Sequence, residues 1–510
     1  MSKELSNRDI EAARIYHATT KHSYTSVRTD GHHLDWDNRP MPYKLYPEVS
    51  GLALPRDLSL ARVTALEAIA AGDAPFDDVE LTLEALTRIL FCADGLTRRT
   101  RVGGQDYHFR AAPSAGALYP IEIYSAVAGT GELEPGLYHF SPADLRLRGL
   151  RRGDWRGLIA RAAAGRPSLL RARAVLVLSA IFWRSAWKYR ARAYRYCFWD
   201  AGTMLANLLA AAAAEGLSTE LVTAFADAEI ETLLGIDGER EGALCLVALG
   251  SGVAAPAAEP ELRPLDLEAI ELSREEVSYP DLVRMHQASR LRGPDEVAAV
   301  ADARIDSVPP SSSSTSATKP EPLDASAGLS LGETILRRGS TRVFAHKPIP
   351  AEELATIMAA SSGHPHADFA ALSDTYVIVN AADGMEPGAY YYRRKSGEFE
   401  LLKAGNFRGE AGYLCLEQPL GADCSALVCY MADLDRVLGV LGNRAYRDAH
   451  LEAGLQGGRA YLAAYALGLG ATGLTFYDDD TANFFAPHAA GKSPLLMVAI
   501  GVPRSSDEET

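Results

Sequence analysis

The chain has 510 residues, of which 47% are hydrophobic and 23% are charged, and its formal net charge is −15. This length exceeds what one hydrophobic core organises, so two or three domains are expected of a globular composition. The acidic excess argues against nucleic acid bound through its phosphates. The sequence shows neither an apolar run of membrane-spanning length nor a signal peptide, so we predict a cytoplasmic protein with no membrane partner.

Cysteines and histidines give no metal-ligand pattern. The six cysteines are scattered, form no CxxC pair and lie mostly in apolar surroundings, so buried free thiols are expected rather than disulfides or zinc. The histidine spacing near the N-terminus also fits no metal site. Three adjacent acids at residues 478–480 are interpreted as a solvated turn. No metal is predicted.

In chain order, the first half alternates predicted helices and strands. Leucine and isoleucine at helical spacing predict a helix over residues 81–92, which Gly95 ends. The stretch 134–140 is predicted to be a turn leading into a strand, and alternating and β-branched residues predict three more strands. These strands cover residues 121–127, 174–181 and 243–250, and a connection at 187–196 leads into a long helix at 200–215.

A change of composition separates the two halves. Residues 309–322 are rich in proline and serine, cannot bury a core and are predicted to form a flexible linker. The charged segment before it, residues 265–301, is partly helical in pattern. The predicted organisation is an extension (1–55), a first domain (56–255), a helical segment with the linker (256–328) and a second domain (329–506).

The second half repeats the first at a fixed offset of 252 residues. The motif Glu-Pro-Gly at 134–136 recurs at 386–388 (386 − 134 = 252), and Ala-Tyr-Arg at 193–195 recurs at 445–447 (445 − 193 = 252). Asp-Ala-Gly at 200–202 matches Glu-Ala-Gly at 452–454 at the same offset. The chain is therefore predicted to contain two copies of one fold.

Each copy lacks a motif that the other keeps. The first copy has a turn of small residues before a strand: Pro113, Ser114, Ala115 and Gly116. The corresponding residues of the second copy are Pro365, His366, Ala367 and Asp368. The second copy has a basic motif: Arg338, Ser340 and Arg342. The predicted helices near residues 89–95 and 357–363 align at an offset of 268 rather than 252, which requires a longer loop in the first copy. This alignment places Arg338, Ser340 and Arg342 on Ala70, Gly72 and Ala74.

The basic motif resembles the R-x-S-x-[RK] motif that nitroreductases place at the FMN phosphate and ring edge. The small-residue turn resembles their P-S-x-x-[NA] turn beside the isoalloxazine. Nearly the whole chain is similar to the nitroreductase superfamily, and in detail to its SagB/ThcOx-type dehydrogenase branch, which includes oxidases that turn peptide azolines into azoles. Family homodimers supply the two motifs from different subunits. The resemblance therefore implies two α+β domains in tandem, forming an intrachain pseudo-dimer around one FMN.

The resemblance also assigns roles to four further residues. Backbone amides near Gly473 and Leu474 are expected to approach the flavin ring. Lys188 and Tyr189 match a Lys-Tyr pair that acts in catalysis in azoline oxidases, and Val440 and Leu441 replace them in the second copy. A partly desolvated lysine can take a proton as hydride leaves, while a tyrosine polarises or relays it. Two arginines can hold a phosphate and the electron-rich edge of the flavin.

The predicted function is an FMN-dependent oxidoreductase that transfers hydride between flavin N5 and a small or peptide-derived substrate, with azoline oxidation in natural-product biosynthesis as the favoured reaction. One alternative is an NAD(P)H-dependent nitro- or quinone-type reductase, which would not need Lys188. Another is a flavin-free pseudoenzyme that serves as a scaffold in a biosynthetic complex. Partner proteins remain open, and a monomer is expected because the pseudo-dimer lies within one chain.

Overall fold

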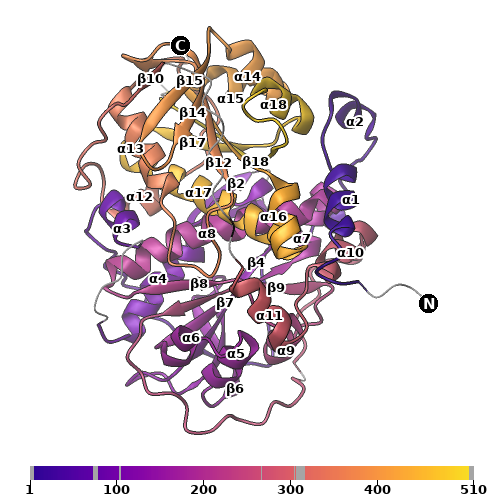
Figure 1. Cartoon of the computed structure of the whole chain (residues 1–510). Coiled ribbons are helices and arrows are strands. Elements are labelled where there is room, and N and C mark those ends of the chain that lie inside the picture. The colour runs from indigo at the N-terminus through magenta and orange to yellow at the C-terminus, as the bar shows by residue number, and fades with distance from the viewer. Residues whose placement is uncertain are drawn as a thin grey trace.

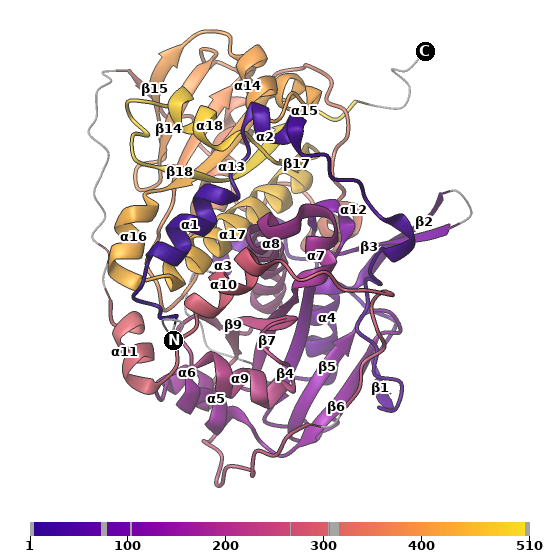
Figure 2. The ribbon, with the colours of Figure 1, turned by 90° about the vertical axis from the view of Figure 1, so that its right-hand side faces the viewer.

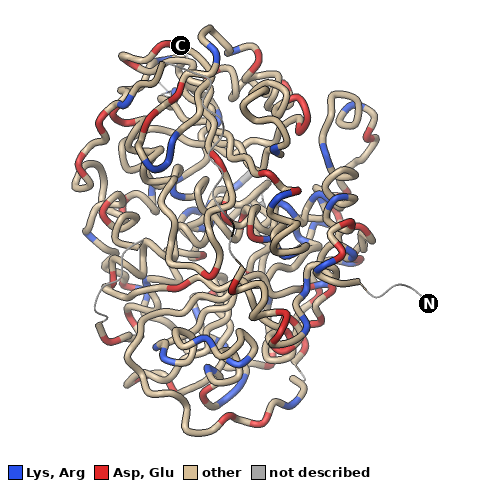
Figure 3. The backbone as a smooth tube through the Cα atoms, viewed as in Figure 1, with Lys and Arg blue, Asp and Glu red and all other residues tan. Residues whose placement is uncertain are grey.

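The computed structural model describes residues 5–72, 79–102, 105–265, 267–303, 305 and 316–504. Two antiparallel sheets, each of seven strands, lie at opposite ends of the molecule, with long helices between them (Figure 1). The expected α+β class with two like domains in tandem is confirmed. Figure 3 shows acidic and basic residues interspersed over both domains on the face drawn.

The first sheet has the order β1-β6-β5-β4-β7-β9-β8, and all its neighbouring strands are antiparallel. Its central strands are buried along their whole length, as their apolar sequences predict. Its strands are β1 (Gly51–Ala53), β4 (Ile121–Val127), β5 (Gly136–Ser141), β6 (Arg146–Arg152), β7 (Ala174–Ile181), β8 (Thr219–Val222) and β9 (Glu241–Leu249).

The second sheet has the equivalent order β10-β15-β14-β12-β16-β18-β17. Its strands are β10 (Ala317–Thr318), β12 (Asp374–Val379), β14 (Gly388–Arg393), β15 (Glu398–Ala404), β16 (Ala426–Ala432), β17 (Gly470–Leu474) and β18 (Ser493–Gly501). Strands β7 and β16 begin 252 residues apart (426 − 174), as do β9 and β18 (493 − 241). The internal repeat predicted from the sequence is therefore confirmed in the order and the register of the strands.

The helices repeat in the same way. Those of the first domain are α3 (Ala65–Ala71), α4 (Leu83–Asp94), α5 (Arg156–Ala162), α6 (Pro167–Arg171), α7 (Phe182–Tyr189), α8 (Ala193–Ala214) and α9 (Asp227–Leu234). Those of the second are α12 (Leu331–Arg337), α13 (Ala351–Ser362), α14 (Arg408–Leu414), α15 (Pro419–Asp423), α16 (Leu434–Leu441), α17 (Arg444–Ala466) and α18 (Asp478–Phe484). A hairpin of β2 (Leu96–Val102) and β3 (Gln105–Arg110) occurs in the first domain, which explains the longer loop inferred there.

One predicted element is wrong. Residues 187–196 are not a connection, because α7 ends within them and α8 begins at Ala193, seven residues before the predicted helix start. The aromatic and arginine side chains of this stretch are mostly buried, so they pack a helix rather than a loop. The apolar stretch 182–214 is consequently long enough to cross a membrane, yet 89% of its apolar window is buried inside the protein. The apolar surface of α7 and α8 is therefore mostly buried inside the protein.

Helices α8 and α17 pack against each other at the centre of the molecule, and two glycines permit their close approach (Figures 1 and 2). A Cβ at Gly202 would lie 2.4 Å from the Leu451 carbonyl oxygen, and one at Gly454 would lie 2.6 Å from the Trp199 carbonyl oxygen. These glycines are equivalent in the two copies (454 − 202 = 252). The pseudo-two-fold axis of the chain therefore passes near this crossing.

Replacing Gly202 by alanine is expected to destabilise the fold by about 1–3 kcal/mol, because the added methyl group overlaps a backbone that has no room to move. Chemical denaturation measures the change in the free energy of unfolding. Gly131→Ala is the control, since a Cβ there meets no described atom within 4 Å. Equal stability of the two variants would contradict this account of the crossing.

The N-terminal extension ties the two domains together. Its helices α1 (Glu11–Thr19) and α2 (Tyr24–Thr29) run along both domains (Figure 2). The amide of Asn443 donates to the Ser6 carbonyl at 3.0 Å, and Tyr16 Oη donates to the Ala191 carbonyl at 2.6 Å. Its strand β1 pairs with β6 and so extends the first sheet.

The interpretation of residues 478–480 as a solvated turn is wrong for Asp478. This side chain is fully buried at the start of α18 and forms ion pairs with Arg195 at 2.7 Å and Arg192 at 3.0 Å. Its pKa is lowered by the two arginines, although burial opposes this. The acid therefore links α18 of one domain to α8 of the other.

Part of the predicted linker, residues 309–315, lies outside the described residues. Within the described part of this predicted linker, β10 pairs with β15 and forms the edge of the second sheet, so residues 317–318 belong to the second domain rather than to a free linker. The preceding segment contains α10 (Pro280–Ala288) and α11 (Pro294–Ala301), as its partly helical pattern predicted.

Candidate functional site

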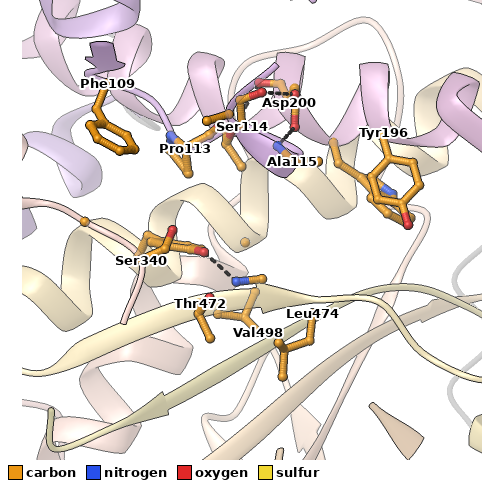
Figure 4. Close-up of a pocket in the computed structure, with 18 of the residues that line it drawn as sticks. Phe109, Pro113, Ser114, Ala115, Tyr196, Asp200, Ser340, Thr472, Leu474 and Val498 are labelled. Carbon is orange, nitrogen blue, oxygen red and sulfur yellow. Dashed lines mark hydrogen bonds between the residues drawn. The ribbon is translucent and has the colours of Figure 1, made fainter. Parts of the chain in front are cut away.

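A cavity of about 680 Å³ lies where the two domains meet, between the small-residue turn of the first domain and strand β17 of the second (Figure 4). Its volume is typical of a site for a cofactor or a drug-sized ligand. All eleven residues proposed for the site from the sequence line this cavity: Pro113, Ser114, Ala115, Gly116, Lys188, Tyr189, Arg338, Ser340, Arg342, Gly473 and Leu474. Residues more than two hundred positions apart are thus brought together.

The small-residue turn has a conformation that demands small side chains. Gly116 has φ of 66°, and a Cβ there would lie 2.9 Å from Tyr189 Oη. Ala117 and Tyr119 also have positive φ, of 53° and 49°. The turn therefore lies tightly against the end of α7, and both the positive φ and the contact with Tyr189 favour glycine at position 116.

Two residues of α8 hold this turn in place. Asp200 accepts hydrogen bonds from Ser114 Oγ at 2.6 Å and from the Ala115 amide at 3.0 Å, and Thr203 Oγ1 donates to the Pro113 carbonyl at 2.9 Å (Figure 4). Burial raises the pKa of Asp200 to about 7, while the two hydrogen bonds oppose the rise. In the sequence, Asp200 stands out only as part of the repeat, and Thr203 belongs to no motif. Nothing in their spacing distinguished them from other helix residues.

Arg338 follows α12 and reaches across to the first domain. Its Nε donates to the Ala111 carbonyl at 2.9 Å, Nη2 donates to the Arg110 carbonyl at 2.5 Å and Nη1 donates to the Gly339 carbonyl at 3.2 Å. The side chain is buried, which lowers its pKa. Three of its five N–H donors are thus used by backbone, and two are left for a ligand.

Ser340 and Arg342 extend the basic motif along the cavity. Tyr461 Oη lies beside Ser340 and accepts a hydrogen bond from the Gly473 amide. Ser340 and strand β17 therefore form one wall, opposite the small-residue turn (Figure 4). Arg342 is exposed and lies near Lys188 at the mouth. Its counterpart by the offset of 268, Ala74, is outside the described residues.

Lys188 and Tyr189 end helix α7 at the same cavity. Tyr189 stacks on Tyr196, with ring centres 4.1 Å apart and planes 13° from parallel, and Lys188 Nζ lies 5.3 Å from the centre of the Tyr189 ring. Burial, Arg342 and Arg39 all lower the pKa of Lys188. Burial raises the pKa of Tyr189 well above its usual range, so the phenol stays protonated. A lysine whose pKa is lowered thus lies beside a neutral hydroxyl donor.

At the equivalent position across the pseudo-two-fold axis, protein fills the space. The Leu221 amide donates to the His366 carbonyl at 2.9 Å, and the Asp368 amide donates to the Leu221 carbonyl at 3.1 Å. The Asp368 carboxylate also accepts from the amides of Thr223 and Ala224. Leu221 corresponds to Gly473 of β17 (473 − 221 = 252). Residues 366–368, which bond to Leu221, therefore occupy the space that corresponds to the open cavity beside β17.

The residues around the open cavity fit a flat, phosphate-bearing cofactor such as FMN. The small-residue turn at 113–116 faces strand β17 across the cavity, and guanidinium groups with unused donors line it. Aromatic side chains, including Phe109, Tyr196 and Trp199, complete the lining. Within the described part of the chain, no group of three or more His, Cys, Asp or Glu side chains is arranged to hold a metal ion. All six cysteines are free and buried, as predicted.

The two like domains and the cavity that joins their complementary motifs agree with the family match. The chain belongs to the nitroreductase family, which matches residues 75–251 and, a second time, residues 335–502. The two matches cover both repeats, and the family resemblance noted in the sequence is confirmed.

Individual relatives agree with this assignment. A protein of Methanocaldococcus jannaschii named as a nitroreductase is 33% identical over 170 residues, which cover 33% of this chain and 81% of that protein. The microcin B17-processing protein McbC of Escherichia coli is 27% identical, and the trifolitoxin-processing protein TfxB of Rhizobium leguminosarum is 29% identical. These two alignments cover 25% and 32% of this chain, and about half of each relative (49% and 46%).

A solved structure shares the whole architecture. A protein of Anabaena variabilis described as a nitroreductase is 27% identical, with a TM-score of 0.78, and the superposition covers 97% of this chain and 99% of that one. The tandem arrangement of two nitroreductase domains in one chain is therefore found outside this protein.

Proposed function

We propose that this protein is an FMN-dependent oxidoreductase with one active site, formed between its two domains. The observation that carries the proposal is the meeting of the two complementary motifs in one cavity, while the mirror position is filled by residues 366–368. FMN, when bound, supplies a two-electron centre that exchanges hydride with a substrate. In this proposal, Arg338 and Arg342 bind the phosphate and the ring edge, and the turn at Pro113–Gly116 faces the ring.

Lys188 is proposed as the base that takes a proton from the substrate as hydride leaves. Its pKa is lowered by burial and by two neighbouring arginines, which increases the fraction of free amine at neutral pH. Tyr189 keeps its proton and so can donate a hydrogen bond to the substrate. Its stacking on Tyr196 fixes the ring in place. Asp200 positions the small-residue turn rather than the substrate.

The favoured substrate is an azoline or a related C–N or C–S bond in a peptide-derived natural product. Support comes from the Lys188-Tyr189 pair at the cavity and from the similarity to two proteins named for processing microcin B17 and trifolitoxin. Partner proteins of a biosynthetic complex are part of the same proposal, as are a cytoplasmic location and a monomeric state. Reduction of nitro or quinone compounds by NAD(P)H is the second candidate, which family membership supports.

Anaerobic reduction of the purified, FMN-loaded protein distinguishes these functions. An azoline-containing peptide is expected to bleach the visible flavin absorption, and Lys188→Ala should prevent this. Bleaching by NADH or NADPH alone, unaffected by Lys188→Ala, would favour the reductase. Failure to bind any flavin would favour the scaffold.

A further inference from the structure

The hairpin formed by β2 and β3 contributes a cation to the cavity that neither motif includes. Arg98 lies on β2 and lines the cavity together with Thr97 and Phe109. Its guanidinium carbon lies 4.4 Å from the centre of the Phe109 ring, an arrangement typical of a cation–π contact. In Figure 4, Phe109 lies at the end of the cavity where Ser340 of the basic motif faces it.

Arg98 has no anionic partner within the described part of the chain. Within the described residues, the side chain of Arg98 has neither an ion pair nor a hydrogen bond, whereas that of its neighbour Arg99 pairs with Asp106 across the same hairpin. The chain has 66 acidic residues against 51 basic ones, so an arginine whose side chain has no acidic partner is unusual here.

Arg98 is also close to Arg338. The hairpin lies beside α12, directly after which Arg338 follows (Figure 2). The two guanidinium groups repel each other, and the pKa of Arg338 is lowered in part by Arg98. An anion bound between these two guanidinium groups would offset their repulsion and accept hydrogen bonds from their free donors.

We propose that Arg98 is a phosphate ligand of the cofactor, so that the FMN phosphate is bound between Arg338 of the second domain and Arg98 of the first. This inference rests on the proposed FMN site. Arg338 keeps two N–H donors after its bonds to backbone carbonyls, whereas the oxygens of a phosphate accept more hydrogen bonds than two. Arg98 can supply further donors from the other domain. The hairpin has no equivalent in the second domain, where a shorter connection joins α13 to β12.

Flavin titration tests this assignment with FMN and with riboflavin, which has the same ring but no phosphate. Flavin-free full-length protein is titrated with each ligand, and the quenching of flavin fluorescence gives the Kd. For Arg98→Ala, the Kd for FMN is expected to rise roughly tenfold or more, while that for riboflavin stays unchanged. Arg99→Ala, on the same exposed hairpin, is the matched control and should leave both values unchanged.

The outcomes separate this inference from the proposed function. Equal FMN affinity of wild type and Arg98→Ala would overturn the inference and leave the flavin site standing. Equal weakening of FMN and riboflavin would also overturn it, because Arg98 would then support the ring or the fold. A wild-type protein that binds neither flavin would overturn the proposed function and the inference together. Riboflavin binding also reports that the variant is folded.

Discussion

Replacing Lys188 by alanine is expected to leave FMN binding intact and to reduce turnover by about 10²- to 10⁴-fold, the usual contribution of a general base. The lysine lines the cavity beside Tyr189 but makes no ion pair with any described residue, so its removal leaves no partner unsatisfied. The measurements are the flavin content of the purified variant and the rate of flavin reduction by the azoline peptide. Lys188→Arg is the matched control, since it keeps the charge but cannot act as a base near neutral pH.

The pH dependence of the same rate tests the role of Lys188 further. A base must be unprotonated, so the rate should rise with pH through the pKa of Lys188, which lies below its usual 10.5. Arg39→Gln removes a like charge that lowers this pKa, so the rising limb should move to higher pH. Unchanged turnover in Lys188→Ala would contradict the assignment of Lys188 as the base. So would a pH–rate profile whose rising part is the same in Arg39→Gln and in the wild type.

Replacing Arg338 by alanine is expected to weaken FMN binding by roughly 10- to 150-fold, the equivalent of about 1.5–3 kcal/mol for one hydrogen bond to a charged group. The side chain is buried where the two domains meet, and it also donates to the carbonyls of Arg110 and Ala111. Loss of these bonds adds a cost in stability. Equilibrium titration with FMN and thermal unfolding of the flavin-free protein measure the two effects separately.

Two variants control for the structural part of this effect. Arg337→Ala changes the neighbouring arginine, which is exposed and does not line the cavity, and should bind FMN as the wild type does. Arg338→Lys keeps the charge but cannot make the same three backbone bonds, so an intermediate affinity is expected. An Arg338→Ala variant that is as stable as the wild type and binds FMN equally would remove Arg338 from the site.

Much of the fold and the cavity could be predicted from the sequence because the chain contains its own comparison. The fixed offset of 252 residues aligned β7 with β16 and β9 with β18 without any relative. The offset of 252 shows that the second copy lacks the small-residue turn, and the offset of 268 shows that the first copy lacks the basic motif. The comparison of the halves singled out the two motifs, and the family resemblance added Lys188, Tyr189, Gly473 and Leu474; all eleven residues line one cavity.

What the sequence could not predict depends on contacts between distant segments. The start of α8 is not apparent in the sequence because Arg192 at its N-cap and Arg195 in its first turn are buried against Asp478, which lies in the other domain. Three adjacent acids predict a solvated turn at residues 478–480, because the sequence alone gives no sign that two arginines pack against Asp478. Asp200 and Arg98 were missed as site residues because only the folded chain brings them to the turn and to Arg338.

The most direct test of the central claim is the visible absorption spectrum of the purified protein, with the released flavin identified and quantified per chain. One FMN per chain is predicted, because one cavity has both motifs and the mirror position is closed by hydrogen bonds between Leu221 and the segment at His366 and Asp368. Two FMN per chain would show that the second position opens and binds cofactor. No flavin, even after incubation with added FMN, would contradict the proposed function and favour a scaffold.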